Sequence, residues 1–320
     1  MSASKAARGR GHTEIDAGTI LVGLIGDAVR RSLSPRMHNA AFAATGLNWC
    51  YVALPVGRAR LGDALRGLVA LGAAGANVTV PHKEAALAYI DETSDEARAV
   101  GAVNTIRVQG ERLAGYNTDG GGLLDALGID GGVSVGGART VVIGAGGAAR
   151  AAAFALADAG AASVVIANRN WDRAASLVAD VRRAFPDRAV EAVPLDGAAV
   201  ARIRDASLLV QATTVGSGAE RAATPVPADA LHPGLFVMDM VYEPRETVLL
   251  REARSRGCPT LEGRSMLVYQ GARAFELWTG RPAPTEVMRR AVGLPAGAAA
   301  GRQETEAGDH TGGPRGRTVG

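Results

Sequence analysis

Short apolar runs alternate with longer amphipathic segments through the first half of the chain. The runs have the length and composition of buried strands, whereas the segments between them repeat their apolar positions at helical spacing. The runs predict strands at residues 19–26, 49–56 and 75–80. The amphipathic segments predict helices at residues 34–46, 59–73 and 83–90.

The same alternation restarts after residue 138. Strands are predicted at residues 139–147, where the run ends in glycines, and at 163–169, 207–214 and 235–242. Helices are predicted at residues 148–160, 171–185, 247–257 and 265–280. Gly160 and Pro186 are the expected stop signals of the first two of these helices. Alternation of this kind predicts an α/β protein with mostly parallel sheets.

Length and composition narrow the class of protein. A chain of 320 residues suggests about two domains. Hydrophobic residues make up 47% and charged residues 21%, with a net charge of +3, as in ordinary globular proteins. No basic stripe with interleaved aromatic residues suggests nucleic-acid binding. No apolar run is long enough to span a membrane, and the basic N-terminus lacks the apolar core of a signal peptide.

The two ends and the two cysteines predict little chemistry. Residues 1–17 and 296–320 have few large apolar side chains, so we expect a disordered leader and a disordered tail. Cys50 and Cys258 stand in no metal-binding or redox spacing. Reduced thiols, and with them a cytoplasmic location, are the expectation.

The segment VVIGAGGAAR carries a dinucleotide-binding pattern. Gly144, Gly146 and Ala149 form G-x-G-x-x-A between a predicted strand and a predicted helix. The first glycine permits the tight turn, the second lets the backbone approach a pyrophosphate, and the helix N-terminus binds the phosphate charge. A second strand follows after a helix of suitable length. A plain glycine turn in an Ala- and Gly-rich chain is the weaker alternative.

The end of that second strand favours NADP over NAD. An NAD site usually has a carboxylate here for the ribose 2′-hydroxyl, whereas this chain has Asn168 and Arg169, with Arg173 one turn further on. Guanidinium groups suit a 2′-phosphate, which a carboxylate would repel. The alternative for Arg173 alone is a solvated charge on the helix surface.

Ser32 and Ser34 precede a helix that Pro35 begins. Their hydroxyls can point into one concavity and hold a small carboxylate beside the helix N-terminus. Ordinary N-capping by Ser34 is the simpler interpretation, and the residues alone favour it.

Lys83 is predicted near the start of a helix, where a cation is unfavourable. A carboxylate, a substrate or solvent must offset its charge. Asn77 and Thr79 share one face of the preceding strand, and the segments GAVNT and NTDG add Asn104, Asn117, Thr118 and Asp119. A lysine paired with an aspartate beside a nicotinamide can transfer a proton to a ketone oxygen as hydride arrives. A solvated lysine is the alternative.

Together these motifs resemble the shikimate dehydrogenase family. The similarity runs from Val22 to Leu294 and is carried by SLSP, GANVTVPHK, GAVNT, NTDG, GAGGAAR, NR with Arg173, DMVY and MLVYQGARAFELW. The resemblance implies NADPH-dependent reduction of 3-dehydroshikimate to shikimate on the route to the aromatic amino acids. It also implies a substrate domain and a Rossmann-type NADP domain with the site between them. The implied boundaries are 18–119 plus 263–295 for the substrate domain and 120–262 for the NADP domain.

The resemblance also implies roles for individual residues. Lys83 and Asp119 form the catalytic pair, and Ser32 and Ser34 hold the substrate carboxylate. The residues implied to bind the ring hydroxyls are Thr79, Asn104, Asp119, Tyr242 and Gln270. Those implied to bind the pyrophosphate are Gly144, Ala145, Gly146, Gly147 and Ala148. Asn168, Arg169 and Arg173 surround the 2′-phosphate, and Met240 and Gly263 lie near the nicotinamide. No metal is implied.

Three positions depart from the usual family pattern: Arg31, His82 and Gln211. None of them removes a catalytic group, but the first two add polarity near the substrate. A dehydrogenase of quinate or an amino analogue, and a ligand sensor without turnover, are therefore the alternatives. A folate dehydrogenase shares the two-domain plan, but the serine motif does not suit a pterin. His38 is expected to be structural, and a homodimer is the candidate assembly.

Overall fold

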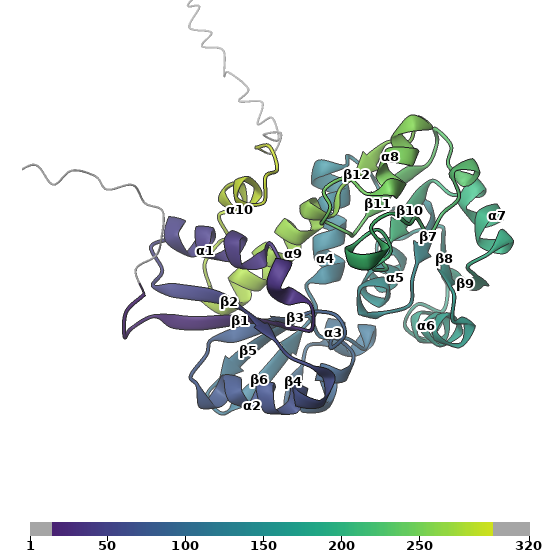
Figure 1. Cartoon of the computed structure of the whole chain (residues 1–320). Coiled ribbons are helices and arrows are strands. Elements are labelled where there is room, and N and C mark those ends of the chain that lie inside the picture. Colours follow the sequence, from purple (N-terminus) through teal and green to yellow (C-terminus); the bar gives the residue numbers. More distant parts are fainter. Residues whose placement is uncertain (1–14, 297–320) are drawn as a thin grey trace, which may run out of the picture.

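Two six-stranded sheets form the two halves of the molecule (Figure 1). The structure, a computed structural model, describes residues 15–296. Of the predicted leader (1–17) and the predicted tail (296–320), residues 1–14 and 297–320 lie outside the described residues. Asp16, from the predicted leader, accepts a hydrogen bond from Asn48 at 2.8 Å.

The first sheet has the order β2-β1-β3-β5-β6-β4. Its strands are β1 (Ile20–Gly26), β2 (Trp49–Pro55), β3 (Gly75–Val78), β4 (Glu92–Thr93), β5 (Thr105–Gln109) and β6 (Arg112–Tyr116). β1 runs parallel to β2 and β3, whereas β5 is antiparallel to both β3 and β6. The β5–β6 hairpin, which turns at Gly110 with a φ of 61°, was not predicted, so this sheet is mixed rather than mostly parallel.

Helices cover both faces of the first sheet. They are α1 (Ser34–Ala44), α2 (Leu61–Ala70) and α3 (Asp95–Val100), joined by α9 (Gly263–Thr279) and α10 (Thr285–Ala291) from the end of the chain. α1, α9 and α10 share an apolar cluster with β1 and β2, in which Phe42 stacks on Phe275. Trp278 of α9 also donates from Nε1 to the Ile106 carbonyl of β5 at 2.9 Å. The C-terminal helices therefore pack on the first sheet.

The second sheet is parallel throughout, with the order β12-β11-β10-β7-β8-β9. Its strands are β7 (Arg139–Ile143), β8 (Ser163–Asn168), β9 (Ala189–Pro194), β10 (Leu208–Gln211), β11 (Phe236–Asp239) and β12 (Thr260–Leu261). α5 (Gly147–Asp158) and α6 (Trp171–Ala184) pack in one apolar cluster, and α7 (Gly197–Asp205) and α8 (Val248–Ser255) in another. This is the doubly wound arrangement of a Rossmann-type fold, whose strand order reverses beside β7.

The structure corrects the prediction of a helix at residues 83–90. The chain instead makes a tight turn after β3 and then a five-residue 3₁₀ helix, Ala85–Tyr89. Lys83 lies in that turn and not at the start of an α-helix. Its charge therefore does not oppose a helix dipole. A helix that the sequence did not predict, α4 (Asp119–Asp125), follows β6 and continues as one π-helical turn, Ala126–Asp130.

α4 crosses α9 at very short range because Gly122 has no side chain. A Cβ at Gly122 would lie 2.6 Å from the backbone nitrogen of Gln270. Gly122→Ala should therefore push α9 away and lower the free energy of unfolding by about 1–3 kcal/mol. Urea unfolding followed by circular dichroism measures this change.

Gly128 is the matched control, because it is exposed and has open space around the Cβ position. Gly128→Ala should be neutral or slightly stabilising, since alanine loses less backbone entropy in a helix. Equal stability of the two variants would contradict the close approach of α4 and α9.

Candidate active site

Lys83 and Asp119 meet at one edge of the first sheet. β3 and β6 run in the same direction because both are antiparallel to β5, so their carboxyl ends lie at the same edge. Lys83 follows β3 and Asp119 follows β6. Lys83 Nζ donates to Asp119 Oδ2 at 2.5 Å, with the two side chains only 14% and 4% exposed. The carboxylate that the lysine charge requires is therefore Asp119, as predicted.

Asn104 fixes the second oxygen of the Asp119 carboxylate. Its Nδ2 donates to Asp119 Oδ1 at 2.8 Å, while its Oδ1 accepts from the Thr118 backbone at 2.8 Å. Gln270 of α9 approaches from the other side, with its Oε1 at 3.4 Å from Asn104 Nδ2. Asn117 accepts from the Asp119 backbone and thereby shapes the same turn. Both oxygens of the buried carboxylate are thus held, and Lys83 faces one of them.

The two serines do not cap α1 in the predicted way. Leu33 occupies the N-cap position, Ser34 is the first helical residue, and no side chain makes a capping hydrogen bond. Ser32 Oγ instead accepts from the Ser34 backbone and lies 3.2 Å from Ser34 Oγ. Tyr242, from the loop after β11, reaches Ser32 with its hydroxyl at 3.4 Å. The hydroxyls of Ser32, Ser34 and Tyr242 therefore converge.

Tyr51 is a member of this cluster that the sequence did not reveal. Its hydroxyl donates to Asn77 Oδ1 at 2.8 Å and contacts the Ser34 hydroxyl, and burial raises its pKa well above the usual value. His38 stacks on the Tyr51 ring with centroids 4.5 Å apart. Burial lowers the pKa of His38 to about 3, so its ring is neutral, in line with a structural role. The one available signal was a tyrosine in an apolar strand.

Thr79 lies at the same edge of the sheet but is less involved. It is half-buried, and its methyl group packs against Gly26, where a Cβ would lie only 2.4 Å away. Although Asn77 and Thr79 share one face of the strand, as the alternation predicts, they differ in burial and in hydrogen bonding. Asn77 is buried and bonded to Tyr51 and Thr105, whereas Thr79 is only half-buried.

The DMVY segment brings Met240 beside Gly263. A Cβ at Gly263 would lie 2.5 Å from the Met240 carbonyl oxygen. Asp239 fixes this loop by accepting from the Val241 backbone at 3.0 Å and from the Thr247 hydroxyl at 2.7 Å. Burial raises the pKa of Asp239 to about 6. The loop that carries Met240 and Tyr242 is therefore held in place by the hydrogen bonds of Asp239.

The glycine-rich loop has the geometry that a dinucleotide site needs. Gly144 has a φ of 116°, a value that other residues rarely adopt. Gly146 is the N-cap of α5, and a Cβ there would meet open space. The first backbone N–H groups of α5, which have no partner within the helix, border that space. The donors and the free volume fit a pyrophosphate beside Ala145, Gly147 and Ala148.

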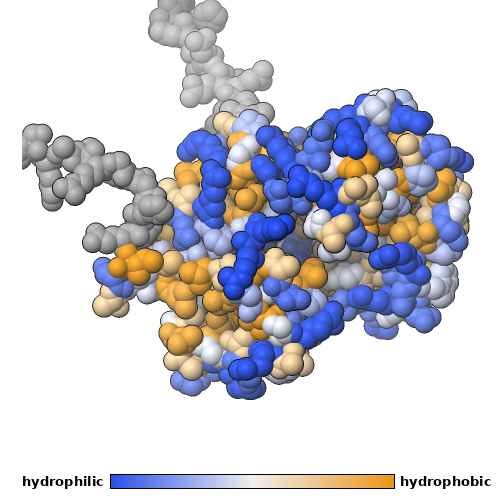
Figure 2. All heavy atoms as spheres, viewed as in Figure 1, coloured by the Kyte–Doolittle hydropathy of each residue, from blue (hydrophilic) through white to orange (hydrophobic). Residues whose placement is uncertain are grey.

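The loop also touches Lys83 directly. A Cβ at Gly147 would lie 2.8 Å from Lys83 Cβ. The turn after β3 therefore rests on the N-terminus of α5, and the two halves of the molecule meet at this point. In Figure 2 the surface between the two halves is hollowed, with hydrophilic residues deep in the recess.

The residues predicted around a 2′-phosphate lie at the end of β8. Asn168 donates from Nδ2 to the Asn170 carbonyl at 2.9 Å, and Asn170 caps α6 by accepting from the Arg173 backbone at 3.0 Å. Arg169 is exposed, and Arg173 forms an ion pair with Glu84 at 2.8 Å. Arg169 lies in the loop between β8 and α6, and the first turn of α6 carries Asp172 as well as Arg173.

Two of the three departures from the family pattern, Gln211 and His82, have structural roles. Gln211 donates to the Thr213 and Val215 carbonyls and accepts from the Thr213 backbone, so it holds the loop beside Gly144. His82 is buried, with Nε2 at 2.6 Å from the Val56 carbonyl oxygen, and it fixes the turn before Lys83. Neither side chain points to a change of chemistry.

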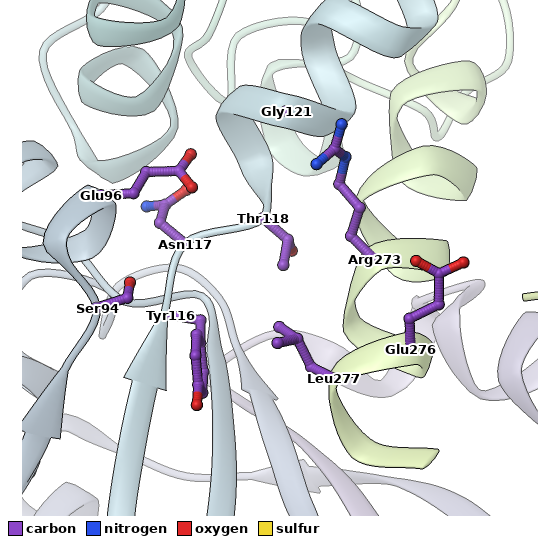
Figure 3. A pocket seen from close by; sticks show the side chains of 9 residues that line it. All are labelled: Ser94, Glu96, Tyr116, Asn117, Thr118, Gly121, Arg273, Glu276 and Leu277. Carbon is purple, nitrogen blue, oxygen red and sulfur yellow. The ribbon is translucent and has the colours of Figure 1, made fainter. Parts of the chain in front are cut away.

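A hollow of about 400 Å³ adjoins the strand end that carries Asn117 and Thr118 (Figure 3). Glu96 and Arg273 flank it from α3 and α9. Burial and the nearby Asp119 charge raise the pKa of Glu96, while Arg273 opposes that shift. Lys83 and the two serines are not among its lining residues, so this hollow is separate from the predicted site.

Residues 15–296 contain neither a membrane-spanning helix nor a cluster of metal-binding side chains. No helix there has both the length and the apolar composition needed to cross a membrane. No group of three or more histidine, cysteine or acidic side chains there could hold a metal ion. Cys50 and Cys258 are both free thiols.

Three family models match consecutive parts of the chain. Residues 24–106 match the shikimate dehydrogenase substrate-binding domain, and residues 130–217 match shikimate/quinate 5-dehydrogenase. Residues 263–292 match the shikimate 5′-dehydrogenase C-terminal domain. The matches include most strands of both sheets, though not β6, β11 or β12, and they include the C-terminal helices α9 and α10.

Individual relatives agree over most of the chain. The shikimate dehydrogenase (NADP⁺) of Methanopyrus kandleri is 50% identical over 280 residues, which cover 87% of this chain and 96% of the relative. The crystal structure of Thermus thermophilus shikimate 5-dehydrogenase with NADP(H) and shikimate has a TM-score of 0.77 at 39% identity, covering 85% and 98% of the two chains. Quinate dehydrogenase from Corynebacterium glutamicum, with NAD, also has a TM-score of 0.77, at 34% identity and with the same coverage.

Proposed function

The chain belongs to the shikimate dehydrogenase family, and we propose that it interconverts 3-dehydroshikimate and shikimate with NADP(H). The observation that carries this proposal is the buried contact between Lys83 and Asp119, directly against Gly147 of the dinucleotide loop. This contact supports the assignment of an acid–base pair beside a cofactor site. The reaction lies on the route to the aromatic amino acids.

In the proposed mechanism, Lys83 delivers the proton. NADPH, when bound, supplies the hydride that reduces the ketone carbon. Lys83 Nζ, charged and paired with Asp119, stabilises the negative charge that develops on the ketone oxygen and donates its proton there. In the reverse direction the neutral amine accepts the proton of the alcohol. Asn104 holds Asp119 so that the carboxylate stays aimed at Lys83.

We assign the substrate carboxylate to the hydroxyls of Ser32 and Ser34. Their convergence with Tyr242, and the failure of Ser34 to act as a helix cap, support this assignment. The ring hydroxyls are assigned to Thr79, Asn104, Asp119, Tyr242 and Gln270. Asn104, Asp119 and Gln270 are already in mutual contact, which favours one binding surface.

The cofactor residues are assigned along α5 and α6. Gly144 to Ala148 take the pyrophosphate, and Asn168, Arg169 and Arg173 take the 2′-phosphate. Met240 and Gly263 lie near the nicotinamide. The domain boundaries given above, a homodimeric assembly and a cytoplasmic location complete the proposal.

The alternatives differ in substrate or in turnover. The quinate relative named above is described with NAD, whereas Arg169 and Arg173 here favour a 2′-phosphate. An enzyme for an amino analogue could keep every contact described. A sensor need not retain an acid–base pair, so the buried contact of Lys83 with Asp119 argues against it.

Steady-state oxidation of shikimate, quinate and aminoshikimate, each with NADP⁺ and with NAD⁺, tests the proposal. We expect kcat/KM for shikimate with NADP⁺ to exceed every other pair by at least about tenfold, since a site built around ring hydroxyls rejects analogues. Preference for another ring would reassign the substrate and keep the mechanism. Binding of NADPH without turnover of any acid would favour the sensor.

A further inference from the structure

Glu84 stands beside the catalytic lysine and holds one of the arginines assigned to the cofactor. We propose that Glu84 competes with the cofactor 2′-phosphate for Arg173 and so selectively weakens the binding of NADP(H) relative to NAD(H). This inference rests on the proposed function, because it assumes that Arg173 binds the 2′-phosphate. It adds a specificity-determining residue from the opposite half of the molecule.

The ion pair joins the two halves. Arg173 Nη2 donates to Glu84 Oε1 at 2.8 Å, with the two side chains 52% and 47% exposed. Arg173 lies in the first turn of α6, whereas Glu84 follows the turn after β3. Solvent and a ligand can therefore reach the pair.

Both ends of the pair are held in place by their backbones. The Arg173 N–H is bonded to the capping Asn170. On the other side, the Lys83 carbonyl accepts from the Val103 backbone at 2.8 Å, and Lys83 Cβ rests on Gly147. Arg150 of α5 adds a second link between the halves, since its Nε donates to the Val100 carbonyl at 2.5 Å. The Glu84 carboxylate is thus kept at the rim of the cofactor site.

The competition follows from charge. The Arg173 guanidinium can make its strongest hydrogen bonds either to the Glu84 carboxylate or to the 2′-phosphate of the cofactor. When both anions lie near it, they repel each other. An exposed ion pair of this kind shifts an equilibrium by about two- to fivefold. NAD(H) has a hydroxyl in place of the phosphate, so its binding leaves the pair intact. The penalty from Glu84 therefore applies to NADP(H) alone.

Cofactor titrations of the full chain, followed by nicotinamide fluorescence at low salt, test the inference. Glu84→Gln keeps the size of the side chain and removes its charge. We expect the Kd for NADPH to fall about two- to fivefold and the Kd for NADH to stay unchanged. In an Arg173→Ala background, the gain from Glu84→Gln should shrink, because only the direct repulsion between Glu84 and the phosphate then remains. The gain for NADPH should also shrink at high ionic strength.

Glu191 supplies the matched control, because it lies on the edge strand β9 and forms an ion pair of similar exposure with Arg202 of α7, at 2.6 Å, without involving Arg169 or Arg173. Glu191→Gln should leave both Kd values unchanged. An unchanged or raised Kd for NADPH in Glu84→Gln, an equal gain for NADH, or an equal gain in Glu191→Gln would overturn the inference. Failure of the underlying function is seen separately, since the unaltered protein would then not prefer NADPH to NADH.

Discussion

Lys83→Ala should remove nearly all reduction of 3-dehydroshikimate while leaving the affinity for NADPH unchanged. Loss of a group that transfers a proton lowers kcat by about 10²- to 10⁴-fold. The affinity should survive because alanine keeps the Cβ that packs on Gly147. Steady-state kinetics and an NADPH titration on the same preparation measure the two effects.

Lys83→Arg is the informative companion to that variant. Lys5 and Lys83 are the only lysines among 35 basic residues, so the chain uses arginine almost everywhere that a fixed charge suffices. Arginine keeps the charge and can pair with Asp119, but it cannot give up its proton near neutral pH. Activity close to that of the unaltered protein in Lys83→Arg would mean that Lys83 acts only as a charge, contrary to the proposed role.

The four central strands of the second sheet, β7, β8, β10 and β11, could be predicted from the sequence because they are buried on both faces. Continuous apolar runs bounded by glycine or polar residues identify such strands without knowledge of their partners. The edge strands β9 and β12 and the helix α7 were not predicted. The first sheet was harder. The β5–β6 hairpin carries Arg107 and Arg112 beside apolar residues, and its pairing with β3 depends on contacts distant in sequence. Segment 83–90 has helical spacing, but only a short 3₁₀ helix forms there.

The pairing of Lys83 with Asp119 could be predicted from the sequence, whereas the surroundings of the pair could not. The position of Lys83 called for a carboxylate to offset its charge, and the segment NTDG contains one, Asp119. Which hydroxyls converge depends on the packing of separate elements. Tyr51 reaches Asn77 across β1, and Tyr242 reaches Ser32 from the other half of the molecule. Local spacing also favoured Ser34 as a helix cap, although Leu33 takes that position.

Replacing both Arg169 and Arg173 with alanine should convert the protein from an NADP-preferring to a cofactor-indifferent enzyme. A hydrogen-bonded contact to a charged group contributes about 1.5–3 kcal/mol, so each arginine should change the KM for NADPH by about tenfold to a hundredfold. The KM for NADH should hardly change, because its ribose hydroxyl needs no guanidinium. Measuring kcat/KM with both cofactors gives the selectivity ratio.

The two single variants should not be equal. Arg169 is exposed beside the end of β8. Arg173, in contrast, must break or weaken its ion pair with Glu84 before it can bind the phosphate. Arg169→Ala should therefore lose more affinity for NADPH than Arg173→Ala. Arg183→Ala is the control on the same helix, since Arg183 lies in its last turn, is 75% exposed and pairs with Asp180. If NADPH and NADH lose affinity equally in the double variant, the arginines support the loop itself rather than the 2′-phosphate.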